Sequence, residues 1–508
     1  MGALRTFRFN APSRMKSTQK SGERTPTGLV PSLGFFSMIL LVVGGVIGSG
    51  IFRKPGIMMH EVGSPMLLLG VWLLAGFINY LGILSNAEIG SMIPDTGGQY
   101  VYFHRMYGPF VAYLYGWAAF VVIQTGSISA LAYVFAEYTT QFVPLMQASP
   151  ELAAWAIHLP FIGDVAPFHD LGVKILASSV IILLTVVNYL GAKLGVIAQN
   201  IFFIAKLAGM ALLVAVVAFS PNGGSFANLT TPSATIHKEG LALLAAIVAA
   251  MQGAFWAFDG CVKATFVAGE TRDPQRTVPK ASWLGMLIVT AIYFTMSLAY
   301  CWALPADVMA NSKLVAADAA EKAVSGGGKW IALLVMTSTF GVTNAVILTS
   351  SRIYYSMALK NAFPAVLGRV HPRFHTPSAA LWIQGIWAVV LVFSGTFDIL
   401  TDTLIFVAWI FYALGAYGVF VLRKKEPNTP RLFKVPLYPW VPAAFVLFAS
   451  AFLVLTIYND VLAYQAAHAA GKPGLINSAL GAALVLIGTP IYFLCRKPHS
   501  TETSGPPG

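Results

Sequence analysis

The chain has 508 residues, of which 57% are hydrophobic and only 10% are charged, and its mean hydropathy is +0.71. A soluble domain carries about 25% charged residues, so this composition excludes a protein that is solvated over its whole surface. Hydrophobic runs of about twenty residues recur along the chain, whereas the short alternating segments of an outer-membrane barrel are absent from the sequence. The expected fold class is therefore an all-α membrane protein with many spans.

The chain begins with a basic, polar segment. Residues 1–32 contain no apolar core of the length of a signal peptide, and we expect them to form a disordered cytoplasmic tail. Twelve transmembrane helices are predicted to follow, over residues 33–52, 66–87, 110–136, 171–190, 197–219, 241–262, 283–304, 330–350, 378–396, 401–422, 438–458 and 474–495. A second polar cytoplasmic tail is expected over residues 496–508.

The net charge of +12 is distributed unevenly along these predicted spans. If the N-terminus is cytoplasmic, the inner segments contain 23 of the 32 Lys and Arg residues, the outer segments contain 8 when Lys174 at the outer end of span four is included, and Lys206 lies deep within a span. This is the positive-inside pattern, which predicts that both termini are cytoplasmic. The basic charge then indicates orientation in the lipid bilayer and contact with anionic lipid, and not binding of nucleic acid.

Span one contains the stretch "VVGGVIGSGIF", in which Gly44, Gly45, Gly48 and Gly50 lie within seven residues. Small residues often serve close helix packing in membranes, and that remains the alternative explanation. Four glycines so close together also weaken the helix, by up to about 1 kcal/mol each relative to Ala. A break is expected here, and a broken helix at membrane depth must be buried in protein or line a cavity.

Span six contains a second interruption, in "GAFWAFDGCVKATF", where Asp259 and Gly260 stand in an apolar run. Spans one and six correspond to each other if two five-helix units repeat with inverted topology, and paired interruptions of this kind indicate a transporter's binding site. Amides at the start of a half-helix attract a carboxylate, and carbonyls at the end of one attract an ammonium group. The two breaks together predict an α-amino acid as ligand.

Lys206, in span five, lies about ten residues from the cytoplasmic end of the span, roughly 10–15 Å deep. Its long side chain can reach the headgroups by snorkelling. The alternative is functional, because a charge inside a membrane is costly and usually has a specific partner.

The remaining polar residues do not indicate enzymatic chemistry. Cys261, Cys301 and Cys495 lie in or at the edges of spans, so no disulfide framework is implied. No histidine shows metal-ligand spacing, and no nucleophile elbow, phosphate loop or zinc-protease motif is present in the sequence. We therefore expect neither an enzyme nor a cofactor.

Four stretches in this order, "VVGGVIGSGIF", "AEIGSMIPDTGGQYVYFHRMYGPF", "AFWAFDGCVKATFVAGETRDPQRTVPKA" and "TSSRIYYSMALKNAFP", resemble the L-amino-acid transporter (LAT) family of the amino acid–polyamine–organocation (APC) superfamily. The resemblance covers roughly residues 33–457 and implies a five-plus-five inverted repeat of the LeuT-like type, with broken helices 1 and 6 and two further helices. The transport core is then expected over 33–422, and an amphiphilic loop with helices 11 and 12 over 423–495. The resemblance also implies sodium-independent exchange or facilitated transport of amino acids.

The resemblance further implies roles for individual residues. Carboxylate contacts fall on Ser49 and Gly50, and ammonium contacts fall on the backbone carbonyls of Val46, Trp256, Ala257 and Asp259. Gly48, Trp256 and Gly260 are implied at the helix breaks and the gate, with Trp256 closing over the substrate. Lys206 resembles a lysine that occupies the volume of a sodium site. Many relatives have Trp at the position of Cys261 and Glu at the position of Gly269, so the pattern departs at these two places.

Three roles for Asp259 remain open: it caps the second half of span six, attracts a cationic side chain, or carries a proton. We expect the cap, and therefore small or medium neutral amino acids as substrates. The alternative within transport is a proton-coupled or exchange transporter of cationic amino acids or polyamines. The alternative from another class is a membrane receptor or channel that binds an amino acid without carrying it.

Eukaryotic members of the family often pair by a disulfide with a single-span glycoprotein, through a cysteine between spans three and four. Residues 137–170 contain no cysteine. We therefore expect no disulfide-linked heavy chain, and a free-standing prokaryotic member in the plasma membrane, that is, the bacterial inner membrane.

Overall fold

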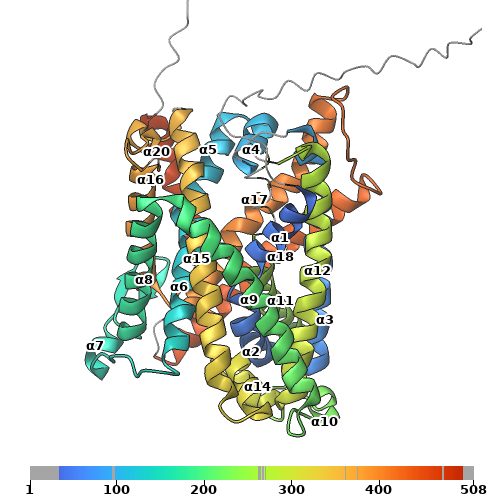
Figure 1. The fold of residues 1–508 in the computed structure, drawn as a ribbon, viewed down its shortest axis with the longest axis vertical. Helices are drawn as coiled ribbons and strands as arrows, with labels where there is room; N and C mark the ends of the chain where they lie inside the picture. The colour runs from blue at the N-terminus through green and yellow to red at the C-terminus, as the bar shows by residue number, and fades with distance from the viewer. Residues whose placement is uncertain are drawn as a thin grey trace, which may run out of the picture.

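The computed structural model describes residues 34–93, 98–260, 262, 265, 268, 271–360, 362–374, 376–471 and 474–495, and for 192–203 it describes the backbone only. The predictions for the tails 1–32 and 496–508, and for Cys261 and Gly269, concern residues outside this part. Within it, the protein is a bundle of long helices, with α20 and the start of α1 toward one end and α2, α10 and α14 toward the other (Figure 1).

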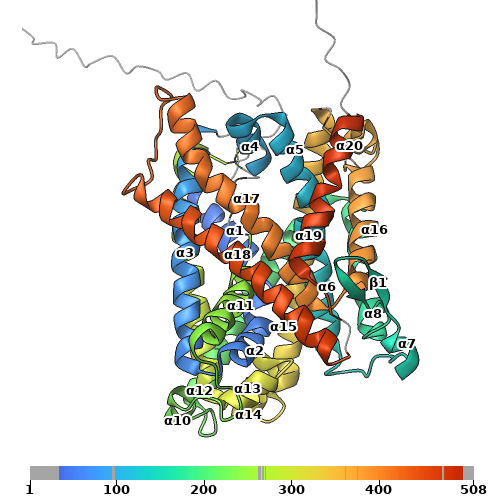
Figure 2. The same ribbon diagram turned by 180° about the vertical axis from the view of Figure 1, so that it is seen from behind.

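Figures 1 and 2 show the arrangement of these elements from two sides. The α-helices are α1 Phe35–Val46, α2 Gly50–Val62, α3 Pro65–Met92, α4 Gln99–Tyr107, α5 Pro109–Ala118, α6 Gln124–Thr139, α7 Pro150–Ala154, α8 Leu171–Leu190, α9 Ala192–Phe219, α10 Phe226–Thr230, α11 Gly240–Phe258, α12 Pro274–Ala303, α13 Ala306–Asn311, α14 Val315–Ala323, α15 Gly327–Leu359, α16 Ser378–Ser394, α17 Phe397–Lys425, α18 Trp440–Ala469, α19 Asn477–Leu486 and α20 Gly488–Cys495. A π-helical turn, η1 Ala119–Ile123, joins α5 to α6, and a 3₁₀ turn, η3 Ala365–Gly368, follows α15. The strands β1 Ile157–Leu159 and β2 Gly163–Val165 form an antiparallel hairpin, which the sequence analysis did not predict.

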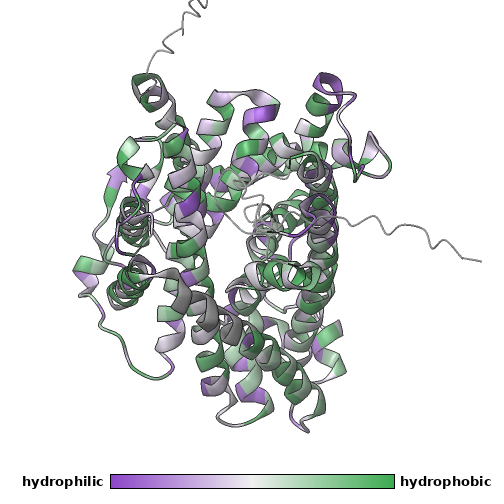
Figure 3. Ribbon diagram, turned by 45° about the horizontal axis from the view of Figure 1, so that its top comes forward, coloured by the Kyte–Doolittle hydropathy of each residue, from purple (hydrophilic) through white to green (hydrophobic). Residues whose placement is uncertain are grey.

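Within the described residues, nine helices are long and apolar enough to cross a membrane, or ten if the bent pair α1 and α2 counts as one span. Two shorter apolar helices, Ile204–Phe219 and Ser378–Ser394, coincide with predicted spans five and nine. Hydrophobic residues run along the helix bodies, while hydrophilic residues gather mostly at helix ends and in connecting segments (Figure 3). The class of all-α membrane protein is confirmed. The number of twelve and the inverted repeat stay predictions.

Both glycine-containing interruptions end a helix. α1 ends at Val46, Ile47 is extended, α2 starts at Gly50, and the two helices are bent by 44°. α11 ends at Phe258, after which Asp259 is extended and Gly260 has φ +106°. A positive φ of this size is open to glycine and costly for other residues, so Gly260 fixes the place where α11 stops.

Close packing of α3 against α12 depends on a small residue. A Cβ built at Gly76 would lie 2.5 Å from Cγ2 and 2.8 Å from Oγ1 of Thr290. Because Thr is branched at Cβ, its side chain has little freedom to move away. On the same helix, a Cβ at Gly70 would meet nothing within 4 Å.

We expect Gly76→Ala to lower the free energy of unfolding by about 1–3 kcal/mol, because it overpacks this contact. Gly70→Ala is the matched control, and it should leave stability unchanged or raise it by up to about 1 kcal/mol through helix propensity. Thermal unfolding of the two purified variants in the same detergent measures the difference. Equal unfolding temperatures would show that α3 and α12 do not pack this closely.

Candidate functional site

The two interrupted helices meet at their breaks. A Cβ built at Gly50, the first residue of α2, would lie 2.5 Å from Cα and 2.6 Å from Cβ of Ala257 in the last turn of α11. The hydroxyl of Tyr293, on α12, lies 2.8 Å from the carbonyl oxygen of Ala257 and 3.2 Å from that of Val46. One tyrosine therefore bridges the C-terminal ends of α1 and α11. Sequence analysis missed Tyr293, and its only signal was a hydroxyl group within an apolar span.

The start of α2 presents hydrogen-bond donors to the break. Ser49 is the N-cap residue and is fully buried, and its hydroxyl has no hydrogen-bond partner among the described residues. The first amides of α2 have no carbonyl one turn earlier to accept their hydrogen bonds. A buried hydroxyl beside free amides at a helix N-terminus is an arrangement that favours a carboxylate.

Lys206 places its ammonium group at the end of α1. The side chain is 3% exposed, and Nζ donates to the carbonyl oxygens of Gly44, at 3.2 Å, and of Ile47. These are carbonyls that the break deprives of helical partners. The lysine head is therefore inside the protein and does not snorkel to the membrane surface. A cation next to a helix C-terminus is also electrostatically favourable.

Asp259 stands at the C-terminal end of α11. Its amide donates to the carbonyl of Trp256 at 3.2 Å, and its carboxylate accepts a hydrogen bond from the hydroxyl of Tyr412 on α17, at 2.5 Å. The cap expected for the second half of span six involves residues beyond Gly260 that are mostly outside the described part, so this role stays a prediction. Tyr412 is a partner that the sequence analysis did not single out.

Polar side chains surround a cavity next to Asp259. It has a volume of about 260 Å³ and is lined by Gln99, Tyr115, Ile123, Gln124, Asp259, Gly260, Val262 and Tyr412. Neither atom of the buried Gln99 amide group has a hydrogen-bond partner among the described residues. The cavity can therefore offer unsatisfied donors and acceptors to a ligand that approaches the break in span six.

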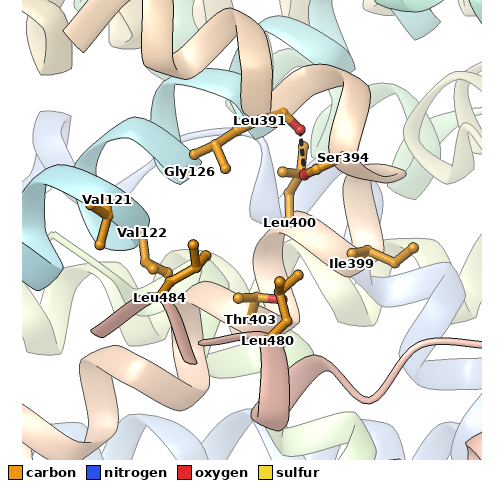
Figure 4. A pocket seen from close by; sticks show the side chains of 10 residues that line it. All are labelled: Val121, Val122, Gly126, Leu391, Ser394, Ile399, Leu400, Thr403, Leu480 and Leu484. Atoms are coloured by element: carbon orange, nitrogen blue, oxygen red, sulfur yellow. Dashed lines mark hydrogen bonds between the residues drawn. The ribbon is translucent and has the colours of Figure 1, made fainter. Parts of the chain in front are cut away.

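A second cavity, of about 280 Å³, lies between η1, α6, α16, α17 and α19 (Figure 4). Its lining is almost entirely aliphatic, as Leu391, Leu400 and Leu484 illustrate. Ser394, its most polar neighbour beside Thr403, already donates to the carbonyl of Leu391 at 2.7 Å. The Thr403 hydroxyl, which has no hydrogen-bond partner among the described residues, is a single neutral group and cannot match the two charged groups of an amino acid, so we assign the candidate site to the breaks.

On the α2 side of the breaks, aromatic rings and charges close the bundle. Trp256 is 6% exposed and packs edge-to-face on Phe397, with ring centroids 6.0 Å apart. Phe397 in turn lies beneath two cations, Lys54 Nζ at 4.9 Å and Arg53 Cζ at 5.6 Å from its centroid.

Each of these two cations has acidic partners. Arg53 pairs with Glu137 at 3.2 Å, and Lys54 pairs with Asp398 at 3.0 Å and Asp402 at 3.5 Å. These ion pairs join α2 to α6 and α17. We call the two cations and their three carboxylate partners the ion cluster.

At the opposite end, ion pairs also join helices. Glu88 of α3 pairs with Arg423 at 2.7 Å and with Arg431 at 3.3 Å. Arg105 of α4 pairs with Glu426 at 2.6 Å, and this hydrogen bond lowers the pKa of the Glu426 carboxyl. The Glu88 pairs join α3 to α17 and to the segment after it. The Arg105 pair joins α4 to that same segment. They lie away from the breaks and contribute no group to the cavity beside Asp259.

Comparison with known proteins finds a matching family and several similar proteins, each over most of the chain. A family model described as amino acid permease matches residues 33–476. The "Serine/threonine exchanger SteT" of Bacillus subtilis (strain 168) is 29% identical over 476 residues, which cover 92% of this chain and 98% of that protein. The "b(0,+)-type amino acid transporter 1" of Homo sapiens is 32% identical over 444 residues, 87% of this chain and 85% of that protein. The "Large neutral amino acids transporter small subunit 2" of Rattus norvegicus is 29% identical over 492 residues, 96% of this chain and 85% of that protein.

The packing around Gly50 gives this glycine a structural role. The resemblance implies that Gly50 contacts the substrate carboxylate, and the structure shows that the space beside its Cα is filled by Ala257. Gly50→Ala should therefore push α2 away from α11 and weaken ligand binding at the breaks by about tenfold or more, because overpacking costs about 1–3 kcal/mol.

Gly48→Ala is the matched control, since its Cβ would lie 3.4 Å from Leu131, an ordinary contact. It should keep binding within about threefold of wild type. Equilibrium binding of radiolabelled amino acids to the purified variants measures both. A Gly50→Ala variant that binds like Gly48→Ala would show that the two breaks are not in contact.

Proposed function

The chain belongs to the amino acid permease family, and from this premise we propose that it carries L-amino acids across a membrane by alternating access. It acts as a sodium-independent exchanger or facilitator and not as an enzyme. The observation that carries this proposal is the meeting of three half-helix ends, those of α1, α2 and α11, in the interior of the bundle. Free amides at the start of α2 match the carboxylate of an amino acid, and the carbonyls at the ends of α1 and α11, each of which can accept a second hydrogen bond, match its ammonium group.

In the proposed complex, the substrate carboxylate binds the first amides of α2, at Ser49 and Gly50, and the Ser49 hydroxyl. The buried, partnerless state of that hydroxyl supports this assignment. The substrate ammonium group binds carbonyl oxygens at the ends of α1 and α11, those of Val46, Trp256, Ala257 and Asp259. Tyr293 holds two of these carbonyls, on Val46 and Ala257, in a fixed relation.

Trp256 forms the lid over this site. Its packing on Phe397, and the packing of Phe397 beneath the ion cluster, supports a gate that is closed at the α2 end of the bundle. We assign that end to the outside, because the outer segments of the sequence hold 8 Lys and Arg residues against 23 in the inner ones. Gly260, with its positive φ, gives the backbone its freedom at the break after α11 during opening, and Gly48 lies in the break between α1 and α2.

The expected architecture follows from the same premise. We propose twelve spans with a five-plus-five inverted repeat, a transport core over 33–422 and two further helices over 423–495. Both tails, 1–32 and 496–508, are cytoplasmic, and the membrane is the plasma membrane of a bacterium. The lack of cysteine in 137–170 supports a chain that works without a disulfide-linked heavy chain.

We propose neutral amino acids of small or medium size as substrates. The name of one relative, a serine/threonine exchanger, agrees with this choice in charge and in size, and the name of another, a transporter of large neutral amino acids, agrees in charge alone. The hydrogen bond from Tyr412 gives the Asp259 carboxylate a partner within the protein, so a cationic substrate is not required to satisfy it. The alternative is that cationic amino acids or polyamines are the substrates. The feature that supports it is the same Asp259 carboxylate, whose negative charge attracts a cationic group.

Uptake into proteoliposomes loaded with unlabelled amino acid tests the proposal. Transport that is stimulated by the internal substrate indicates exchange, and equal rates with and without it indicate facilitated transport. Rates that follow an imposed pH gradient would favour a proton symporter. Binding without uptake would overturn the proposal in favour of a receptor.

Replacing sodium by choline in this assay should leave uptake unchanged, because the Lys206 ammonium group occupies the carbonyls of Gly44 and Ile47. Lys206→Met should reduce uptake about tenfold to a hundredfold, since hydrogen bonds to a charged group are worth about 1.5–3 kcal/mol. Wild-type uptake that falls clearly in choline would contradict the proposed role of Lys206.

Asp259→Asn should reduce uptake of neutral and cationic amino acids to a similar extent, because the change acts on the end of α11 and its bond to Tyr412. Competition by alanine, serine, leucine, lysine and arginine measures the two classes in one experiment. A selective loss of about tenfold or more for the cationic substrates would instead show that Asp259 reads the substrate's charge.

A further inference from the structure

The segment between α6 and α8 carries an exposed apolar surface. Seven of its large hydrophobic side chains are exposed, those of Phe142, Val143, Met146, Leu152, Trp155, Ile157 and Phe161. We call this surface the flank patch. Trp155 is 50% exposed, and Phe161, in the turn of the β1–β2 hairpin, is 97% exposed. An exposed Trp and Phe so close together are unusual unless something covers them.

The backbone presents Phe161 in a fixed way. Its φ is +65°, in the left-handed region that a bulky residue rarely adopts. The hairpin is held against the segment before α19, since the amide of Asp164 donates to Gly474 at 2.8 Å and the amide of Ile476 donates to Ile162 at 2.8 Å. An unfavourable conformation in a tethered turn that exposes a Phe side chain is a reason to look for what that side chain contacts.

The position of the patch indicates the kind of partner. In Figures 1 and 2, α7 lies at the side of the bundle, beside the end of α8, and not beyond the end with α10 and α14. The amide of Gly172 donates to the carbonyl of Met146 at 3.0 Å, so the segment that carries the patch is held against the start of α8. That helix is a membrane-span candidate and exposes Ile175, Ile182 and Leu183. The flank patch therefore lies beside the end of a helix whose exposed apolar side chains suit lipid.

The charge of the segment agrees with this partner. The sequence contains no Lys or Arg between Arg105 and Lys174, so the segment itself supplies neither residue to pair with a phosphate group. Aromatic side chains, and Trp above all, are stable at the boundary between headgroups and hydrocarbon. A segment with exposed Trp and Phe and without Lys or Arg suits that boundary.

We infer that the flank patch inserts into the membrane interface and anchors the β1–β2 hairpin and α7 to the lipid beside α8. The anchor holds the connection between α6 and α8 in place while α6, which carries one half of the Arg53–Glu137 pair, changes its contacts. This inference rests on the membrane spans and does not depend on which substrate is carried.

Photo-crosslinking of the full chain in phosphatidylcholine nanodiscs tests it. Phe161→p-benzoylphenylalanine keeps the aromatic ring, and mass spectrometry identifies what the probe has reacted with. Leu183→p-benzoylphenylalanine on α8 is the lipid-facing control, and Lys322→p-benzoylphenylalanine, at an exposed charged position at the end of α14, is the water-facing control.

We expect the probe at position 161 to give lipid adducts at a yield similar to that at 183 and about tenfold above that at 322. A tenfold preference corresponds to about 1.4 kcal/mol, near the lower limit for burial of a Phe side chain. The same probe at Trp155 provides a second reading if the variant at 161 does not yield monodisperse protein.

Two results would overturn the inference. Crosslinks from 161 and 155 to a second copy of the chain would identify the patch as a protein interface. Yields at both positions as low as at 322 would place the patch in water. Transport is not the readout of this experiment. If the wild-type protein does not transport amino acids, the proposed function is refuted, whereas the crosslinking result is unaffected.

Discussion

A broken helix in hydrocarbon must find partners for its free backbone groups, and the rest of this structure depends on how that requirement is met. The carbonyls at the end of α1 are reached by Lys206 from α9, and those of Val46 and Ala257 by Tyr293 from α12. Unpaired polar groups cost several kcal/mol in lipid, so these two side chains hold α1, α9, α11 and α12 together. The helix start that they leave unpaired, with the buried Ser49 hydroxyl, is the part available to a ligand.

The two sides of the breaks differ in chemistry. Toward the α2 end, Trp256, Phe397 and the ion cluster fill the space, and Lys54 is almost completely buried between two carboxylates. Toward the other side, a polar cavity reaches Asp259. Buried ion pairs are costly to separate unless water or new partners replace the contacts. The ion cluster is therefore suited to a closed state that opens only when α2 moves as a unit away from α6 and α17.

Asp259 illustrates how one residue serves neighbouring requirements. Its extended backbone ends α11, its amide closes the last turn onto Trp256, and its carboxylate binds Tyr412 across the interface with α17. Trp256 and Asp259 are three positions apart in the chain. Any movement of the lid residue Trp256 is therefore coupled through the backbone to Asp259, which lies in the wall of the polar cavity. α17 therefore contributes to both sides of the breaks, through Asp398 and Asp402 in the ion cluster and through Tyr412 in the wall of the polar cavity.

The sequence by itself determined the membrane class, the existence of most spans and the two interruptions, because hydrophobic run length and glycine content act locally. It also singled out Asp259 and Lys206, since charged groups in apolar runs are rare and costly, while Ser49 and Trp256 were implied by the resemblance to a known family. Only the tertiary structure decided their partners. Tyr293, Tyr412 and Phe397 are ordinary aromatic residues of apolar helices, and their contacts with the breaks join positions far apart in the chain. The role of Gly50 was likewise decided by packing, because nothing in its local sequence shows that Ala257 fills the space beside it. Contacts of this kind depend on which helices lie side by side, and that is set by the fit of whole helix surfaces and not by any single stretch of residues.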